Sequence, residues 1–240
     1  MKNTRILLSI LLIITLSIAS YSKEEKSQKI EKDFSMTSYM RNGEIKDFLN
    51  LKTITFQDQK YELYYSTAVS VGGQKSILQE YVPMGQTVFD FDQMITVQLF
   101  YTMSDEESSE GYAYGKLESL NARSKVLPYT RGAIGYVEEE QEYIVEFVAS
   151  SGFDSDSKDK VLEWGVYRYY DFKNSKNEKY VMVIEFSKRH YGEQGAKKFA
   201  NEVGILQEKY MVDFNEMELP KVNFLSKSEL TEENLKKYKE

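Results

Sequence analysis

The sequence from position 61 onward repeats short strand-like segments separated by turn residues, and this feature constrains the fold more than any other. The segments are rich in aromatic and β-branched residues, which favour strands. Seven segments follow the pattern: Tyr61–Val69, Lys75–Val82, Met94–Thr102, Ile134–Glu138, Glu142–Ala149, Leu162–Phe172 and Tyr180–Ser187. Polar connections between neighbouring segments indicate hairpins, and strands joined by hairpins are antiparallel. The strand–helix alternation that is typical of a parallel sheet is absent.

Two helical segments accompany the strands. Ser104 precedes three acidic residues, and this pattern predicts a helix start because a hydroxyl caps free N–H groups and carboxylates favour the positive helix end. The helix is expected to run to about Ser124. The second helix, Glu193–Met211, has apolar residues at helical spacing on one side. The order β-β-β-α-β-β-β-β-α predicts an α+β fold, a mostly antiparallel sheet of about seven strands covered on one face by two helices.

The first 22 residues are typical of a secretory signal peptide. Met1–Ser22 begins with Lys2 and Arg5, continues with the mainly apolar 13-residue run Ile6–Ile18 and ends with small residues. Thirteen helical residues span about 20 Å, less than the ~30 Å hydrocarbon core of a membrane. Cleavage after Ala19 or Ser22 is therefore favoured over a retained anchor. We expect an exported protein, periplasmic or secreted, with no stable membrane span after cleavage.

The remaining chain divides into three parts. Residues 23–48 are mostly charged and predict a polar spacer. Residues 49–215 form the expected single α+β domain. Residues 216–240 form a polar tail with a short capped helix and no apolar face long enough to dock firmly. The chain has no cysteine, which excludes disulfides and thiolate metal sites, so its stability must come from burial of a core.

The acidic charge balance excludes one class of partner. The net charge is −7, and removal of a signal peptide that contains Lys2, Arg5 and no acidic residue leaves about −9. Binding of nucleic acid depends on Lys and Arg contacts with phosphates. We therefore expect no nucleic-acid partner, and no electrostatic attraction to an anionic membrane surface.

The sequence contains no strong catalytic motif, so no catalytic residue is assigned. His190 is the only histidine and lies at the end of a predicted strand, without a nucleophile motif nearby. No phosphate loop, dinucleotide fingerprint or zinc-protease motif is present, so we expect no cofactor. The carboxylates of Asp90 with Asp92, or of Glu138–Glu140, are candidates for an acid–base pair. Acidic residues at turns, however, are usually only solvated.

The segment Asp154–Asp159 alternates acidic residues with polar ones, as the beginning of a calcium loop does. An EF-hand loop also requires glycine at its sixth position and glutamate at its twelfth. These positions here are Asp159 and Gly165. The segment is therefore interpreted as a polar connection between strands, with weak calcium binding as the less favoured alternative, and no metal site is predicted.

Tyrosine is abundant, with 19 residues. Tyr167, Tyr169, Tyr170 and Tyr191 are the candidate binding residues, because tyrosines on both faces of a strand indicate that one face is only partly covered. A groove lined by tyrosine suits peptides or sugars, since the rings pack while the hydroxyls form hydrogen bonds. Ordinary strand propensity explains the same residues and is the favoured alternative. Trp164 lies in mid-strand and is expected in the core.

Residues 84–92 are expected to form a corner between two strands. Pro83 cannot donate a ladder hydrogen bond, so the preceding strand should end there. Phe89 and Phe91 alternate with Asp90 and Asp92. An extended corner would place both rings under the sheet and both carboxylates in water.

This corner also carries a family resemblance. The segment EYVPMGQTVFDFDQMITVQLF (80–100), with WGVYRY (164–169) and FANEV (199–203), resembles small, mostly uncharacterised exported bacterial proteins with a PsbP-like α+β fold. The resemblance covers about Thr55–Met211. Those proteins are expected to carry tryptophan near the position of Phe89–Phe91. The resemblance assigns no functional residue, and it implies a non-catalytic envelope protein by analogy of fold.

Three functions remain open from the sequence. The favoured hypothesis is a non-catalytic binding or interaction module with a protein or small-ligand partner in the envelope. The alternative is a carboxylate-dependent hydrolase that acts on carbohydrate or peptide, and the third is a structural envelope component. Two carboxylates about 5–10 Å apart in a cleft, one with a raised pKa, would favour the hydrolase. A flat or tyrosine-lined sheet face would favour binding.

Overall fold

The computed structural model describes residues 40–41, 44–71, 74–104, 106–127, 129–151, 160–174 and 176–238. The predicted signal peptide, most of the predicted spacer and the segment Asp154–Asp159 lie outside these residues. Within the described ranges, no helix is both long and apolar enough to cross a membrane. The buried part of the chain begins with Phe48, which the sequence assigns to the spacer and which is only 3% exposed.

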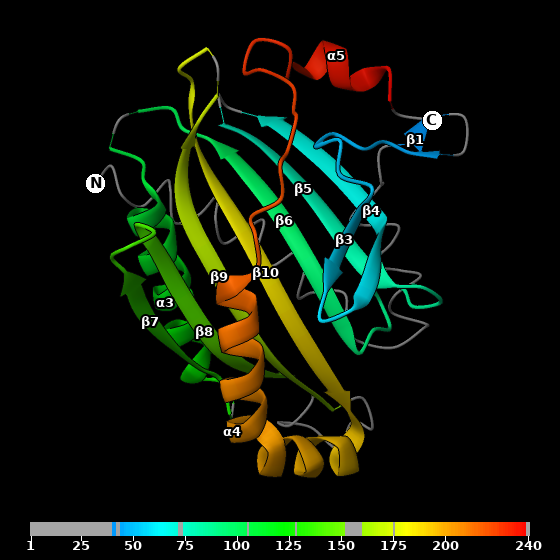
Figure 1. Ribbon diagram of the computed structural model, residues 1–240, viewed down its shortest axis with the longest axis vertical. Helices are drawn as coiled ribbons and strands as arrows, with labels where there is room; N and C mark the ends of the chain where they lie inside the picture. Colours follow the sequence, from blue (N-terminus) through cyan, green and yellow to red (C-terminus); the bar gives the residue numbers. More distant parts are fainter. Residues whose placement is uncertain are drawn as a thin grey trace.

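Eight strands form one curled antiparallel sheet (Figure 1), in the order β3-β4-β5-β6-β10-β9-β8-β7. The strands are β3 (Thr53–Phe56), β4 (Gln59–Val71), β5 (Gln74–Pro83), β6 (Gln93–Tyr101), β7 (Arg131–Val137), β8 (Glu142–Ser151), β9 (Val161–Lys173) and β10 (Lys179–Tyr191). Two four-stranded meanders meet where their last strands, β6 and β10, pair. A separate small sheet pairs β1 (Met40–Arg41) with β2 (Glu44–Ile45). The seven predicted strands are confirmed, whereas β1, β2 and β3 are too short for the sequence pattern to reveal.

The two long helices, α3 (Ser109–Ser124) and α4 (Gly192–Glu216), cover opposite faces of the sheet. Helix α4 lies across β9 and β10 (Figure 1), where Phe199 and Phe214 join the main core. Helix α3 packs Ala113 and Leu120 against the other face of β8 and β9. The expectation that both helices share one face is therefore wrong. Successive strand residues point to opposite faces, and both faces of the central strands carry side chains that require burial.

The sheet thus has an α4 face and an α3 face, each covered by the helix of that name. The α4 face contains Ile95, Val97, Leu99 and Tyr101 of β6, which confirms the predicted apolar side of that strand. It also contains Trp164, which is fully buried as expected. The α3 face contains the alternate residues of the same strands. This face is more polar, and helix α3 covers only its β7–β9 half.

Helix α3 begins later than the sequence suggests. Its N-cap is Ser108, whose Oγ accepts from the Gly111 N–H at 3.4 Å, and Glu110 lies in the first turn. Asp171 of β9 accepts hydrogen bonds from the backbone N–H and the hydroxyl of Ser109. Tertiary contact with β9 therefore fixes the helix start, and Ser104 remains in the preceding turn.

The C-terminal tail packs on the α4 face. Leu230 and the α5 (Glu232–Lys236) residue Leu235 are 0% and 3% exposed. The Phe224 ring lies 4.7 Å from the Tyr180 ring, and Lys227 Nζ donates to the Thr102 carbonyl at 2.9 Å. The expectation that the tail does not dock is therefore wrong. Its apolar residues are spaced too irregularly to form a helical stripe, but they fit individually into the core.

The corner at residues 84–92 is confirmed in part. Strand β5 ends at Pro83, Gly85 has φ +85°, and Asp90 and Asp92 are exposed. Phe91 is buried, but Phe89 is 46% exposed, so its predicted burial is wrong. The backbones of Thr87 and Asp90 exchange two hydrogen bonds of 3.2 Å and close a tight turn. The alternation of an extended chain does not apply inside such a turn.

Candidate functional site

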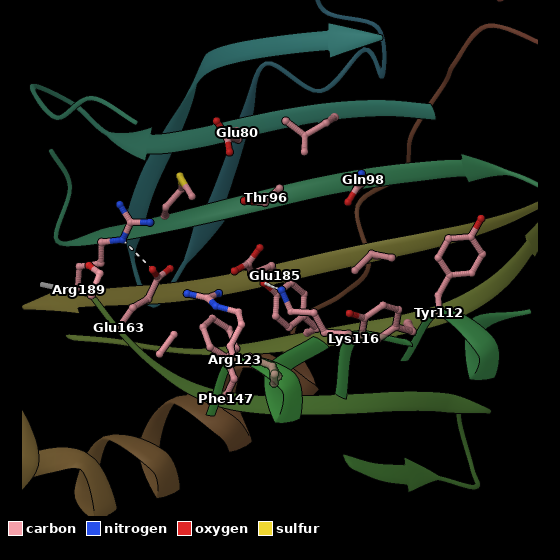
Figure 2. A pocket seen from close by; sticks show the side chains of 18 of the residues that line it. Glu80, Thr96, Gln98, Tyr112, Lys116, Arg123, Phe147, Glu163, Glu185 and Arg189 are labelled. Carbon is pink, nitrogen blue, oxygen red and sulfur yellow. Dashed lines mark hydrogen bonds and ion pairs between the residues drawn. The ribbon is translucent and has the colours of Figure 1, made fainter. Parts of the chain in front are cut away.

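The α3 face contains a cavity of about 100 Å³, called the α3-face cavity below (Figure 2). Strands β5, β6, β10 and β9 form its floor. Lys116 and Arg123 of α3 lie on one side, and Glu80, Thr96 and Gln98 lie on the other. Side chains from six elements, the four floor strands with β8 and α3, therefore converge on one small space.

The strand register places four of these side chains in one row across the floor. Glu80 of β5 pairs with Thr96 of β6, Thr96 pairs with Glu185 of β10, and Glu185 pairs with Tyr167 of β9. Neighbouring strands are about 4.8 Å apart, so the Cα atoms of Glu80 and Glu185 are about 10 Å apart with Thr96 between them. Two carboxylates thus face the same cavity across a hydroxyl.

Two polar side-chain atoms of strand β6 face the cavity and have no hydrogen-bond partner among the described residues. They are Thr96 Oγ1 and Gln98 Nε2, which project from alternate positions of β6. Thr96 is only 6% exposed. A buried polar atom without a partner costs about 1–3 kcal/mol, and native proteins leave few of them. The two atoms offer hydrogen bonds to a group bound in the cavity.

The Glu80 carboxyl is also buried, with 5% exposure. Burial, then the nearby Glu185 carboxyl, raises its pKa to about 7, although the Arg189 guanidinium opposes the shift. No described residue forms an ion pair or hydrogen bond with this carboxyl, so its charged form has lost water without gaining a partner. A cationic group in the cavity would stabilise the carboxylate.

Lys116, Tyr167 and Glu185 form a connected chain at the α3 side. Lys116 Nζ donates to the Tyr167 hydroxyl at 2.6 Å and lies 4.2 Å from the centre of the Tyr167 ring. Burial raises the pKa of Tyr167, so the hydroxyl stays protonated and donates a hydrogen bond to Glu185. Burial likewise raises the pKa of Glu185 and lowers that of Lys116, while the attraction between the two opposes both shifts. The chain satisfies the lysine and this second glutamate internally.

Two arginines differ in how they are paired. Arg189 Nε donates to Glu163 Oε2 at 2.8 Å, and its guanidinium lies 4.1 Å from the centre of the Phe91 ring. Arg123 also lines the cavity, but no described residue forms a hydrogen bond or ion pair with it. Burial lowers the pKa of Arg123, yet arginine remains charged near neutral pH. The cavity therefore presents one unpaired guanidinium and one unpaired carboxyl, Glu80.

Gly165 shapes one end of the cavity. A Cβ at this position would lie 2.5 Å from Cε1 of Phe147 and 2.9 Å from the Phe186 carbonyl oxygen. The Phe147 ring can therefore lie directly on the β9 backbone, where it also packs 5.2 Å from the Tyr167 ring. The absence of a side chain at Gly165 allows the Phe147 ring to lie beside Lys116.

The structure brings two of the four predicted binding tyrosines to the cavity. Tyr167 and Tyr169 line it from β9. Tyr170 points to the α4 face, where its hydroxyl contacts the Met182 sulfur at 2.5 Å. Tyr191 lies at the end of β10 and exchanges hydrogen bonds with the Phe91 backbone. Neighbouring positions in a strand necessarily face apart, so a run of tyrosines cannot form one surface.

The other candidates from the sequence lie elsewhere. Asp90 and Asp92 are exposed at the corner, and Glu138–Glu140 form the exposed tip of the β7–β8 hairpin. His190 packs 5.0 Å from the Phe199 ring, and burial lowers its pKa, which favours the neutral imidazole. Among the described residues, no group of three or more His, Asp or Glu side chains has the arrangement of a metal site.

The sequence pattern alone did not reveal the residues that define the cavity, namely Glu80, Thr96, Gln98, Lys116, Arg123, Glu163, Glu185 and Arg189. One signal was available in the sequence. In the central strand β6, Thr96 and Gln98 alternate with apolar residues, and Glu185 sits between two fully buried residues of β10. Polar residues on one side of a central strand indicate a functional or solvated face.

Comparison with known proteins places the chain in a family. A family model matches residues 49–219, which is most of the chain. The chain belongs to this uncharacterised family. The matched range includes every residue that lines the α3-face cavity. Comparison with curated proteins gives no match.

Proposed function

We propose that this chain is an exported, non-catalytic binding protein whose α3-face cavity holds a small polar ligand. The observation that carries the proposal is the burial of Thr96 Oγ1 and Gln98 Nε2 in the cavity without partners among the described residues. Each such atom costs about 1–3 kcal/mol, so a sheet selected for stability alone would have apolar residues there. A ligand that forms hydrogen bonds with both atoms recovers this cost.

The size of the cavity favours a small ligand over a polymer. An engineered protein cavity of about 150 Å³ holds one benzene molecule. The α3-face cavity, at about 100 Å³, encloses a group of similar or smaller size. A sugar ring with its hydroxyls or a peptide segment exceeds this volume. The ligand is therefore a small molecule, or the head group of one, rather than a protein partner or a nucleic acid.

A carboxylate-dependent hydrolase is the second candidate. Glu80 and Glu185 face one cavity, and burial raises the pKa of both. Their Cα separation of about 10 Å, two strand spacings, is compatible with an acid and a base on opposite sides of a bond. The small volume disfavours carbohydrate and peptide substrates. Release of product from a panel of glycosides and dipeptides, lost in Glu80→Gln, would favour this candidate.

The binding proposal is tested by screening small amines, amino acids, carboxylates, polyols and sugars for an increase in the thermal stability of the purified protein. We expect one chemical class to raise the unfolding temperature of the wild type and to have no effect on the variant Thr96→Val/Gln98→Leu. This variant should be as stable as the wild type or more stable, because it removes unpaired polar atoms. The exposed Thr55→Val is the matched control and should respond as the wild type does.

Two outcomes would overturn the binding proposal. The first is that no class raises the unfolding temperature of the wild type while the double variant is folded. The second is that every active compound stabilises the double variant as much as the wild type. Either result would leave the cavity as a packing defect of the α3 face.

Export is supported by the pattern of Met1–Ser22 and by the resemblance of residues 80–100 to exported bacterial proteins with a PsbP-like fold. The intact mass of the protein from its native host tests this part. A mature chain that begins at Ser20 or Lys23 is expected. Recovery of the chain with Met1–Ser22 retained in the membrane fraction would favour the anchor instead.

A further inference from the structure

The α3-face cavity contains charges of both signs, and their pairing is unequal. Six acidic or basic side chains line it: Glu80, Glu163, Glu185, Lys116, Arg123 and Arg189. Two pairs are satisfied within the protein, Arg189 with Glu163 and Lys116 with Glu185 through Tyr167. Glu80 and Arg123 remain without an ion pair or hydrogen bond among the described residues. One carboxyl and one guanidinium therefore face the cavity unpaired.

These two groups lie on different sides of the cavity. Glu80 is on β5 beside Thr96, and Arg123 is in the last two turns of α3, close enough to Glu163 and Tyr167 of β9 to interact electrostatically with both (Figure 2). A ligand with only a negative charge would leave the buried Glu80 carboxylate unpaired, which is costly, and a ligand with only a positive charge would leave the partly exposed Arg123 guanidinium without a partner. A ligand with both charges satisfies both.

We infer that the ligand of the α3-face cavity is a small zwitterion of the α-amino-acid class, with its ammonium group at Glu80 and Thr96 and its carboxylate at Arg123. This inference rests on the proposed binding function and names the ligand class. The planar guanidinium of arginine matches a carboxylate with two parallel hydrogen bonds. An ammonium group donates three hydrogen bonds, and the Glu80 carboxylate and Thr96 Oγ1 both accept.

The dimensions and surroundings agree with this class. The charged head of an amino acid has about five non-hydrogen atoms, which suits a cavity somewhat smaller than one that holds benzene. Gln98 follows Thr96 as the next residue on the same face of β6, and its Nε2 can donate to the ligand carboxylate. Beyond it, the partly exposed rings of Phe100 and Tyr112 pack with their centres 4.5 Å apart. These rings offer an apolar site for the side chain of the amino acid.

The test measures binding by calorimetry at pH 8, where both Glu80 and a free amino group are largely charged. The probes are L-alanine and L-leucine, with ethylamine and propionate as fragments that each keep one charge of alanine. We expect the better amino acid to bind at least about tenfold more tightly than either fragment, because loss of a charged hydrogen bond costs at least that factor.

Two variants separate the roles of the charges. Glu80→Gln should weaken amino-acid binding by about tenfold or more and leave propionate binding unchanged, whereas Arg123→Gln should weaken amino-acid binding similarly and leave ethylamine binding unchanged. Glu62→Gln on β4 and Lys125→Gln at the end of α3 alter partly or fully exposed charges and should bind as the wild type does. Circular dichroism confirms that each variant is folded, and Arg123→Lys supplies a second variant that keeps the charge but loses the bidentate geometry.

The results also separate this inference from the proposed function. Equal affinity of alanine and one of its fragments, or unchanged alanine binding in both Glu80→Gln and Arg123→Gln, would overturn the zwitterion. Binding of a polyol or sugar alone, abolished by Thr96→Val/Gln98→Leu, would overturn the zwitterion and retain the binding cavity. No binding of any compound class would overturn both.

Discussion

The two faces of the sheet bury charge in different ways. On the α4 face, Arg168 is 3% exposed and each nitrogen of its guanidinium donates a hydrogen bond. It donates to Glu142 at 2.8 and 3.0 Å and to the Phe214 and Met217 carbonyls at 2.9 and 2.8 Å, which closes the end of α4. On the α3 face, Glu80 is buried to a similar degree but has no partner among the described residues.

The paired Arg168 and the unpartnered Glu80 have different effects on the stability of the fold. A buried ion pair whose hydrogen bonds are all satisfied orients the elements that it joins, in this case β8, β9 and α4. A buried carboxyl, hydroxyl and amide that lack partners contribute nothing to the fold and reduce its stability. Arg168 and Glu142 therefore have a structural role on the α4 face, whereas Glu80, Thr96 and Gln98 make the α3 face the candidate binding surface.

The largest expected effect comes from breaking the satisfied pair. Arg168→Met leaves Glu142 buried without a partner and frees two carbonyls of α4, so the free energy of unfolding should fall by about 3–5 kcal/mol. Urea unfolding of the purified protein measures this change. Arg168→Met/Glu142→Leu should recover part of the loss, because no buried charge remains. A loss below about 1 kcal/mol in the single variant would remove the contrast between the faces.

On the α3 face, removal of the buried Glu80 charge should increase the free energy of unfolding instead of lowering it. The folded Glu80 carboxyl has a pKa of about 7, against an ordinary value of 4.5. Between these values the folded state holds more protons than the unfolded state, so the free energy of unfolding falls as pH rises from about 4.5 to about 7. Over the full shift this loss is roughly 3 kcal/mol. Glu80→Gln should therefore be more stable than the wild type at pH 8.

Unfolding of the two proteins at pH 5 and at pH 8 checks this sign. The variant should lose less stability than the wild type between pH 5 and pH 8. Burial also raises the pKa of Glu185, so the free energy of unfolding still falls somewhat with pH in both proteins. Glu62→Gln is the control and should follow the wild type. Parallel curves for wild type and Glu80→Gln would show that Glu80 has found a partner in solution.

A smaller loss of stability is expected from a change at Gly165 in β9. Gly165→Ala places a methyl group 2.5 Å from the Phe147 ring and 2.9 Å from a backbone oxygen of β10, which should cost about 1–3 kcal/mol. Gly135→Ala in β7 is the control, because no atom lies within 4 Å of its added Cβ. Thermal unfolding compares the two. Equal unfolding temperatures would indicate that Phe147 does not lie on the sheet, and the cavity would lose one end.

The strands and the two long helices were predictable because each depends on a local pattern. Alternation identified β6, and helical spacing of Phe199 and Tyr210 identified α4. The assignment of helices to faces was not predictable, because every central strand has side chains to bury on both sides. The docking of the tail likewise depends on single residues such as Leu230, whose partners are distant in the sequence.

The candidate site was less predictable than the fold. Glu80 and Glu185 are more than 100 positions apart, and only the pairing of β5, β6 and β10 brings them into one row. That pairing joins the ends of two meanders, which local sequence does not specify. Tyr167 and Tyr169 were identified because several tyrosines cluster in one strand segment. Thr96 and Gln98 belong to no motif, and only their lack of hydrogen-bond partners in the folded structure marks them.

The most direct test of the difference between the faces is a nuclear magnetic resonance titration of the labelled protein with L-alanine and L-leucine at pH 8. The side-chain amide of Gln98 and the backbone amide of Thr96 should shift with ligand concentration, while the Arg168 guanidinium signal on the α4 face stays unchanged. Shifts at Arg168 without shifts at Gln98 and Thr96, or no shift at any of the three, would contradict the assignment of binding to the α3 face.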